Sequence, residues 1–394
     1  MKLLIVNYEY PPLGGGGGVA TRDIAEALAA RGHEVHALTS GAPGLPPEEV
    51  VGGVRLFRVP VLGRDARATA SILSMLSFWP LGVRHGREVL AREHGYDAVN
   101  TWFAVPSGPT GVQLARRASA PHVLTLAGGD IYDPSKWYTP DKNPVLAGVV
   151  RWVLRSADAH VAVSTDLARR ARQIYGFEQP VEVISPGADA PVFPPATRAE
   201  IGLDPDLTYV ITVGRLVRRK NLARLFEAIA AVGRPDLHLL VVGDGPEQGP
   251  LRALAAERGL GDRVHFRGFV PESVKHQLLA NADIFALPSL HEAFGLVYLE
   301  AMHCGLPVLA ARPGGQEDYL EEDVSGYLLP PDDVPGLTAA LGRLAADPAL
   351  RRRMGAANRG RARAFSVGHA AERYEALFAR LRELAPAKAV AAAA

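Results

Sequence analysis

The feature that most constrains the fold is a regular alternation of short apolar runs with longer helical segments. Residues 3–7 (LLIVN) predict a strand, residues 19–32 (VATRDIAEALAARG) place apolar side chains at helical spacing, and residues 34–40 (EVHALTS) predict a second strand. This order favours two parallel strands joined by a right-handed crossover. The alternation predicts an α/β protein built on doubly wound sheets.

The alternation continues along the chain but lapses once, over the proline- and glycine-rich residues 186–206. Because 394 residues exceed what one hydrophobic core usually supports, we expect two domains. Further strands are predicted at residues 54–60, 96–102, 122–128, 158–164, 181–187, 209–215, 237–246, 263–270, 282–289 and 306–315. The predicted parts are an N-terminal acceptor-side domain (1–187), a linker (188–206), a C-terminal donor-nucleotide domain (207–365), and a C-terminal helix with a frayed tail (366–394), the helix being free to pack back on the first domain.

Composition and charge narrow the class of protein. Hydrophobic residues make up 48% of the chain and charged residues 22%, which is typical of a globular protein and not of a disordered one. The net charge of +1 provides no overall field that would gather nucleic acid, so none is expected as a partner. Cys304 is the single cysteine, and the first residues become polar too early for a secretory signal, so we expect a cytoplasmic protein.

One apolar segment suggests contact with a membrane surface. Residues 68–80 (ATASILSMLSFWP) lie between Arg64, Arg67, Arg84 and Arg87, a composition that suits peripheral binding to anionic lipid at the inner face of a membrane. No apolar run approaches the roughly 18 residues needed to span a bilayer. A helix that covers the core or an acceptor cleft is the alternative, and we favour it at this point.

Five consecutive glycines, Gly14 to Gly18, lie between the first predicted strand and helix. Their backbone N–H groups and the helix start could approach an anion closely. The run is not a P-loop, and Val19 breaks the G-x-G-x-x-G pattern, so binding of a dinucleotide is not favoured. A flexible turn is the alternative.

Two further motifs fall in the second half of the chain. The strand at 209–214 leads into RLVRRKN, which places Arg215 and Lys220 ahead of a helix whose predicted cap is Asn221. Two cations at the carboxyl end of a strand could hold a diphosphate, whereas a solvated basic loop is the alternative.

Glu292 and Glu300 lie eight residues apart around a second predicted helix start. On a helix this spacing corresponds to about 12 Å, so the two carboxylates could hold opposite ends of an elongated ligand. Between them, Phe294, Gly295 and Leu296 would present backbone N–H groups to a phosphate. A sugar, a diphosphate and a ribose match this layout in order.

These motifs resemble those of the retaining glycosyltransferases of the family 4 type, which have the GT-B fold: two Rossmann-like doubly wound domains facing across a cleft. The resemblance covers nearly the whole chain. It rests on NYEYPPLGGGGGVA, RGHEV, VGRLVRRKN and ADIFALPSLHEAFGLVYLEAMHCGLPVLA. The Glu-x7-Glu spacing in the last motif is its specific part.

The resemblance implies a role for each candidate residue. Arg215 and Lys220 would bind the donor diphosphate and stabilise its charge as it leaves. Glu292 would contact sugar hydroxyls near the reacting face, and Glu300 would hold the ribose. The other implied donor contacts, at the phosphates and the nucleobase, are Gly15, Gly16, Gly17, Gly268, Phe269 and Val270.

The resemblance also implies the reaction. A hexose would pass from a nucleoside-diphosphate sugar (UDP, GDP or ADP) to a hydroxyl of a glycan, a lipid-linked acceptor or a small molecule, with retention of anomeric configuration. No metal is expected, because cations and N–H groups can stabilise the leaving diphosphate and no Asp-x-Asp motif ends a strand in a suitable loop. A sugar-nucleotide epimerase and a non-catalytic nucleotide-sugar binder stay open as alternatives.

The chain departs from the family pattern at one position. Family members commonly carry histidine in a Thr-x-His-Gly setting, where this chain has Ala127. Asp130 or another polar residue could supply the missing sugar contact, or the donor sugar could be bound differently. Trp137 and Tyr138 could form an aromatic platform for the acceptor or anchor a loop.

Overall fold

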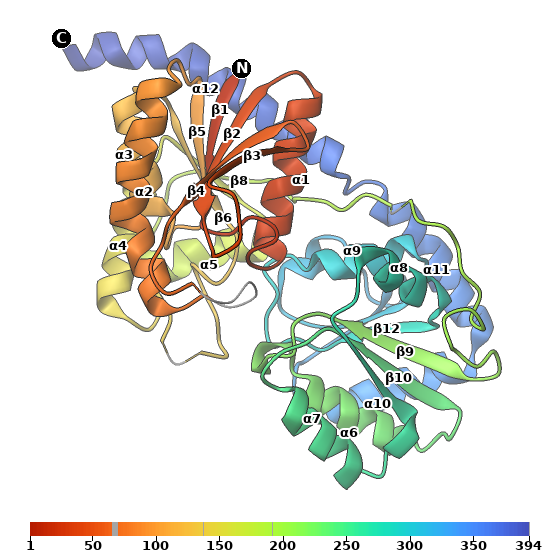
Figure 1. Ribbon diagram of the computed structural model, residues 1–394. Helices are drawn as coiled ribbons and strands as arrows, with labels where there is room; N and C mark the ends of the chain where they lie inside the picture. Colours follow the sequence, from red (N-terminus) through yellow and green to blue (C-terminus); the bar gives the residue numbers. More distant parts are fainter. Residues whose placement is uncertain (65–69, 137, 191, 394) are drawn as a thin grey trace. The chain divides into compact units, whose positions relative to one another are not determined.

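The computed structural model describes residues 1–64, 70–136, 138–190 and 192–393, with side chains described as far as residue 384. Contacts divide it into two compact units, coloured along the chain in Figure 1. Unit 1 comprises Met1–Gly187 together with the C-terminal residues from Val367, and unit 2 comprises Ala188–Ser366. The last helix therefore belongs to the same unit as the first strand.

Unit 1 is built on an eight-stranded sheet in the order β3-β4-β2-β1-β5-β6-β7-β8. Only β3 is antiparallel among the described strands, at the edge of an otherwise parallel sheet. The strands are β1 (Lys2–Val6), β2 (Glu34–Ser40), β3 (Glu48–Val51), β4 (Val54–Val59), β5 (Ala98–Trp102), β6 (His122–Leu126), β7 (Ala159–Ala162) and β8 (Val181–Val183). The strand order reverses between β1 and β5, which is the switch point where open α/β sheets bind ligands.

Helices cover both faces of this sheet (Figure 1). They are α1 (Gly16–Ala30), α2 (Ile72–Arg92), α3 (Gly108–Ala118), α4 (Pro144–Ser156), α5 (Thr165–Tyr175) and α12 (Val367–Ala393). Helices α2, α3 and α4 pack on one face, and α1 packs with α12 on the other. Tyr374 of α12 stacks on Trp102 with ring centroids 6.3 Å apart and hydrogen-bonds Thr125, so the last helix is part of the unit 1 core.

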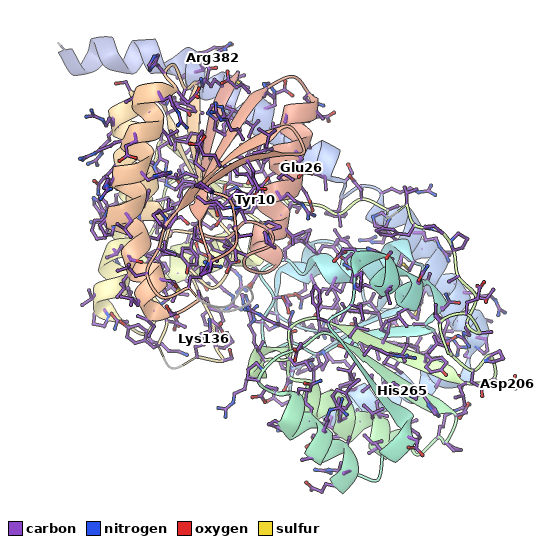
Figure 2. The ribbon with its side chains drawn as sticks, in the orientation of Figure 1. Tyr10, Glu26, Lys136, Asp206, His265 and Arg382 are labelled. Carbon is purple, nitrogen blue, oxygen red and sulfur yellow. The ribbon has the colours of Figure 1, made fainter. Side chains whose placement is uncertain are left out.

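Unit 2 is built on a six-stranded, fully parallel sheet in the order β11-β10-β9-β12-β13-β14. Its strands are β9 (Thr208–Val213), β10 (Leu237–Val242), β11 (Val264–Gly268), β12 (Ile284–Leu287), β13 (Val308–Ala311) and β14 (Gly326–Leu329). Its helices are α6 (Leu222–Val232), α7 (Gln248–Glu257), α8 (Glu272–Asn281), α9 (Leu296–His303), α10 (Val334–Ala346) and α11 (Pro348–Ala362). The strand order reverses between β9 and β12. Side chains fill the layers of both units (Figure 2).

The sequence predicted twelve of the fourteen described strands within a few residues, but not the edge strands β3 and β14. The prediction that the Asn221 side chain caps α6 is wrong. Asn221 does occupy the N-cap position, but it has a φ of 54° and makes no side-chain capping hydrogen bond. Its amide instead donates to the carbonyl of Pro331 at 2.7 Å, so it ties the start of α6 to the loop after β14.

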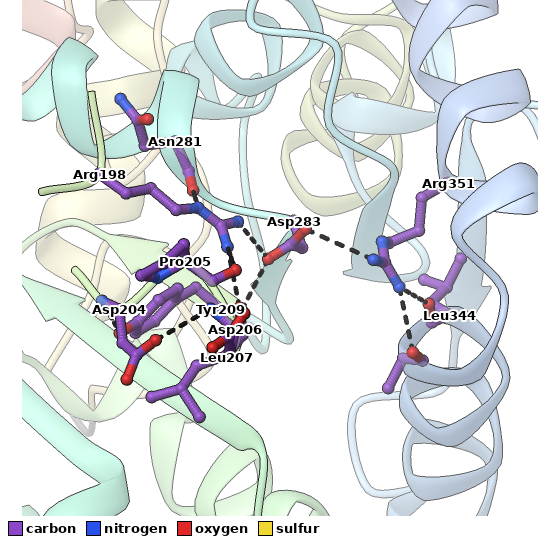
Figure 3. A network of polar contacts seen from close by, with 11 residues as sticks. Arg198, Asp204, Pro205, Asp206, Leu207, Tyr209, Asn281, Asp283, Leu344 and Arg351 are labelled. Carbon is purple, nitrogen blue, oxygen red and sulfur yellow. Dashed lines mark hydrogen bonds and ion pairs between the residues drawn. The ribbon is translucent and has the colours of Figure 1, made fainter. Parts of the chain in front are cut away.

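A polar network fastens the start of unit 2 to the amino-terminal end of its sheet (Figure 3). The Arg198 guanidinium donates to the Asp283 carboxylate at 2.7 Å and to the carbonyl of Asn281 at 3.0 Å. Asp283 also accepts from the backbone N–H of Tyr209 at 2.8 Å and lies 3.5 Å from the Arg351 guanidinium. One partly buried carboxylate thus connects the segment before β9 with β9, β12 and α11.

We predict that Asp283→Asn destabilises the protein by about 2 kcal/mol, because it removes the charge that both guanidinium groups face. Urea unfolding followed by far-UV circular dichroism measures the change. The exposed Asp206→Asn is the matched control and should leave the midpoint in place. An unchanged midpoint for Asp283→Asn would show that the network contributes nothing.

Candidate active site

The candidate site lies in unit 2, where the loops after β9 and β12 meet at the switch point of the sheet. These two strands are neighbours, so the loops at their carboxyl ends run side by side. The backbone N–H of Leu290 donates to the carbonyl of Arg219 at 2.8 Å. The first loop carries Arg215 and Lys220, and the second carries Glu292. Residues 72 positions apart in the sequence are thereby brought together.

Lys220 and Glu292 form a buried ion pair. The Lys220 Nζ lies 2.6 Å from Glu292 Oε1, and the two side chains are 12% and 8% exposed. Burial alone would raise the pKa of the Glu292 carboxyl, but the charges of Lys220 and Arg219 lower that pKa to about 2. Burial lowers the pKa of the Lys220 ammonium, and the facing carboxylate opposes that shift. The two side chains thus form an ion pair that is largely shielded from water, at the carboxyl end of the sheet.

The loop after β9 is locked against the loop after β10. The N–H of Leu216 donates to the carbonyl of Asp244 at 2.8 Å, and the N–H of Gly214 donates to Val242 at 2.9 Å. A Cβ on Gly243 would lie 2.0 Å from the carbonyl oxygen of Gly214, and the φ of Gly243 is +126°. Only glycine fits there. No role for Gly243, Asp244 and Gly245 was predicted from the sequence, although two glycines directly after a strand are a usable signal.

Helix α9 begins at the edge of the same site. Its N-cap, Gly295, has a φ of +85°, and the Tyr319 hydroxyl donates to the carbonyls of Phe294 and Gly295 at 2.6 and 2.9 Å. The N–H of Tyr298 donates to the carbonyl of Gly295 at 3.0 Å, and the N–H groups of Leu296 and Val297 before it lie at the positive end of the helix dipole. Glu292 thus lies outside the helix, four residues ahead of its first residue, and the predicted phosphate contacts of Phe294, Gly295 and Leu296 stay predictions.

Glu300 lies in the second turn of α9, where a lysine neutralises it. The Lys275 Nζ of α8 lies 2.9 Å from Glu300 Oε2 and 2.6 Å from Glu272. Burial would lower the pKa of Lys275, but the two carboxylates raise it. The Glu300 carboxylate is therefore partly buried and held in place before any ligand arrives.

The predicted nucleobase loop follows β11 on the same edge. The carbonyl of Gly268 accepts from the N–H of Gly243 at 2.7 Å, which joins this loop to the one after β10. Phe269 is 87% exposed, and Val270 is partly exposed. An aromatic ring this exposed at the end of a central sheet is available for stacking, as predicted for a nucleobase contact. The contact itself stays a prediction.

Two groups of described acidic and histidine side chains come close enough together to hold a metal ion. They are Glu34 with His36 and Glu93 in unit 1, and Glu272 with His276 and Glu300 in unit 2. In each group a lysine already contacts both carboxylates, Lys2 in the first and Lys275 in the second. We therefore assign a metal to neither group.

In unit 1 the glycine run forms the start of α1. Gly15 is the N-cap, and its N–H donates to the Glu9 carboxylate at 3.0 Å. A Cβ on Gly17 would lie 2.4 Å from the ring of Phe103, whereas Gly15 and Gly16 face open space. The run therefore combines one packing requirement with a backbone that is open to a ligand. Its predicted contact with the donor phosphates stays a prediction.

The remaining candidates of unit 1 lie near the end of β6. Asp130 is 3% exposed, and its carboxylate accepts from the N–H groups of Ala104 and Gly128, both at 2.8 Å. Burial raises the pKa of Asp130 to about 6, although these hydrogen bonds oppose the shift. Asp130 thus joins the loops after β5 and β6. Tyr138 is exposed, and Trp137 lies outside the described residues.

Comparison with known proteins identifies the family. The model of Glycosyltransferase Family 4 matches residues 14–190, and that of Glycosyl transferases group 1 matches residues 195–361. A D-inositol 3-phosphate glycosyltransferase of Xylanimonas cellulosilytica is 30% identical, over 95% of this chain and 94% of its own length. The chain belongs to glycosyltransferase family 4. The predicted family and enzyme class are confirmed.

Two further relatives of this glycosyltransferase cover nearly its whole length. A GDP-mannose-dependent alpha-(1-6)-phosphatidylinositol monomannoside mannosyltransferase of Mycolicibacterium smegmatis is 30% identical over 91% of this chain and 92% of its own. The solved structure of sucrose-phosphate synthase from Thermosynechococcus elongatus matches with a TM-score of 0.85 and 27% identity, covering 97% of this chain and 99% of that one. The predicted GT-B fold is confirmed.

The ion pair makes a prediction about stability. Lys220→Met leaves the Glu292 carboxylate buried without its partner, which should cost about 3 kcal/mol at neutral pH. Adding Glu292→Gln should recover most of the loss, because the buried charge is gone. Urea unfolding of the wild type, of Lys220→Met, of Glu292→Gln and of the double variant measures the coupling as a double-mutant cycle.

The loss of stability in Lys220→Met should depend on pH. Without Lys220 the pKa of Glu292 should rise above its unfolded value, so the penalty is present at high pH and is relieved as protonation sets in. The stability gap between wild type and Lys220→Met should therefore narrow as the pH is lowered from about 7 to about 5. A stability difference between wild type and Lys220→Met that does not change with pH would contradict a charged Glu292 carboxylate in the variant.

Proposed function

We propose that this glycosyltransferase transfers a hexose from a nucleoside-diphosphate sugar to a hydroxyl acceptor, with retention of anomeric configuration and without a metal ion. The observation that carries the proposal is the buried Lys220–Glu292 pair at the switch point of the unit 2 sheet, next to the first turn of α9. The carboxyl end of such a sheet is where α/β proteins bind nucleotides.

The charges around the pair suit a diphosphate leaving group. Breaking the bond between sugar and phosphate leaves negative charge on the diphosphate. Lys220, the exposed Arg215 and the N–H groups at the start of α9 would oppose that charge from positions set before the reaction. Since these groups are already in place, little reorganisation is needed when the bond breaks, and the proposed stabilisation uses no metal ion.

The carboxylates would recognise the two ends of the donor. Glu292, four residues ahead of α9, would accept hydrogen bonds from sugar hydroxyls. Glu300, inside α9, would accept hydrogen bonds from the ribose hydroxyls while it keeps its ion pair with Lys275. The exposed ring of Phe269 would stack on the base. The mannosyltransferase relative is named for its dependence on GDP-mannose, which supports a nucleotide-sugar donor here.

The reaction is tested by incubating the protein with UDP-, GDP- and ADP-sugars and a panel of hydroxyl acceptors, and following nucleotide release. Transfer should release nucleotide in proportion to product, and proton NMR of the new glycoside should show the donor's anomeric configuration. Activity should persist in EDTA. An inverted product would overturn the retaining mechanism, and a new sugar nucleotide without release would identify an epimerase.

Lys220→Ala should lower turnover by about 100-fold, the scale for the loss of one charge-stabilising donor. Arg218 lies in the same loop, and its side chain is 83% exposed, so Arg218→Ala is the matched control and should keep nearly full activity. Equal turnover in the two variants would remove Lys220 from the mechanism.

Glu300→Ala should weaken donor binding by about tenfold with a smaller effect on turnover, because the ribose contact is the same in the ground and transition states. Isothermal titration with the preferred donor measures the affinity. Glu257→Ala, an exposed position on α7, is the control. Unchanged affinity in Glu300→Ala would contradict the ribose assignment.

A further inference from the structure

Helix α2 of unit 1 has a core-facing side and an exposed side that is apolar at one end. Phe78, Val83 and Val89 are buried in the core, which agrees with the expectation that this helix covers it. Ile72, Leu73, Leu76 and Trp79, however, are 63%, 55%, 64% and 41% exposed. These four side chains, here called the α2 patch, lie within the first eight residues of the helix.

The α2 patch is a single surface and not a scatter of apolar residues. Positions 72, 73, 76 and 79 recur at the spacing of one helical face. The ring of Trp79 lies 6.2 Å from that of Trp152 on α4, so the patch continues toward that helix. Val145, at the start of α4, is 74% exposed. Large apolar side chains grouped on a surface in this way mark an interaction site.

The charge next to the patch is strongly one-sided. Arg84 and Arg87 follow Leu73 and Leu76 by eleven residues, about three helical turns, so they extend the same exposed face. Together α2, α3 and α4 contain seven arginines and one glutamate, Glu88. Glu88 lies 3.7 Å from the exposed Arg84, and Arg92 pairs with Glu48 at 2.8 Å. These three helices are still more basic than the whole chain, which has 43 basic and 42 acidic residues.

No helix in the described part of the chain is long and apolar enough to cross a membrane.

We propose that the α2 patch docks on an anionic phospholipid bilayer, with its four apolar side chains entering the interface and Arg84 and Arg87 contacting lipid phosphates. Aliphatic residues and tryptophan followed by arginines on one helix face are the features that hold a helix in the plane of a bilayer surface. The apolar end of α2 is its start, which follows β4 and lies toward the carboxyl edge of the unit 1 sheet. Docking would therefore bring the ligand-binding edge of this unit close to the lipid surface.

The test uses the full chain and vesicles of phosphatidylcholine, alone and mixed with phosphatidylglycerol, in a flotation assay. Wild type should bind the mixed vesicles and bind the neutral ones less. Leu73→Ser with Leu76→Ser should lower the partition coefficient by at least about tenfold, because two apolar side chains no longer enter the interface. Arg84→Gln with Arg87→Gln should lower it about tenfold at low salt.

Matched controls lie elsewhere on the chain. Val50→Ser removes a 68% exposed apolar side chain from β3, and Arg352→Gln with Arg353→Gln removes two exposed charges from α11. Both should keep wild-type binding. Vesicles with brominated acyl chains should quench the fluorescence of wild type, and Trp79→Phe should lose most of that quenching. Circular dichroism melting of each variant shows whether it is folded.

Several outcomes would overturn the proposal. They are wild type that fails to bind anionic vesicles, binding that the serine variants leave unchanged, and binding that is lost in the controls to the same degree. A dimer in solution that dissociates in the serine variants would assign the α2 patch to a second copy of the chain. Vesicle binding needs no donor or acceptor, so its failure leaves the proposed reaction untouched.

Discussion

The buried pairing of Lys220 with Glu292 is the interaction on which the candidate site depends. Neither charge is stable alone in a place this poorly exposed to water, so each fixes the position of the other. The pair joins the loops after β9 and β12, and the backbone hydrogen bond from Leu290 to Arg219 holds the same two loops together. A cation is thereby kept rigid beside the start of α9, where an anionic ligand would add to an arrangement already formed.

The surrounding loops show how the parallel sheet produces such a place. Strand order reverses between β9 and β12, the loops that follow these two strands lie side by side, and α9 begins at their edge. On the other side, Gly243 allows the loops after β9 and β10 to touch backbone to backbone, and Gly268 continues the contact to β11. Four consecutive strand ends thus form one rigid edge, along which Phe269, Lys220, Glu292 and the start of α9 are arranged.

Much of this architecture could be predicted because it depends on local patterns. Alternation of apolar strands and amphipathic helices located the central strands, and the Glu-x7-Glu spacing located the start of α9. What could not be predicted depends on distant contacts. Asn221 stands at the N-cap position of α6, but its side-chain amide donates to the carbonyl of Pro331. Lys220 and Lys275 were visible as charges, but only the fold shows which carboxylate each one faces. The short strand β14 has too weak a pattern to be found alone.

The most direct test of the account is a crystal structure of the protein with the nucleoside diphosphate that it releases. The account predicts diphosphate oxygens within about 3 Å of Lys220 Nζ and of the backbone N–H groups at the start of α9, the ribose at Glu300 and the base against Phe269. A nucleotide bound away from these groups, with the Lys220–Glu292 contact and the start of α9 facing only solvent, would contradict it.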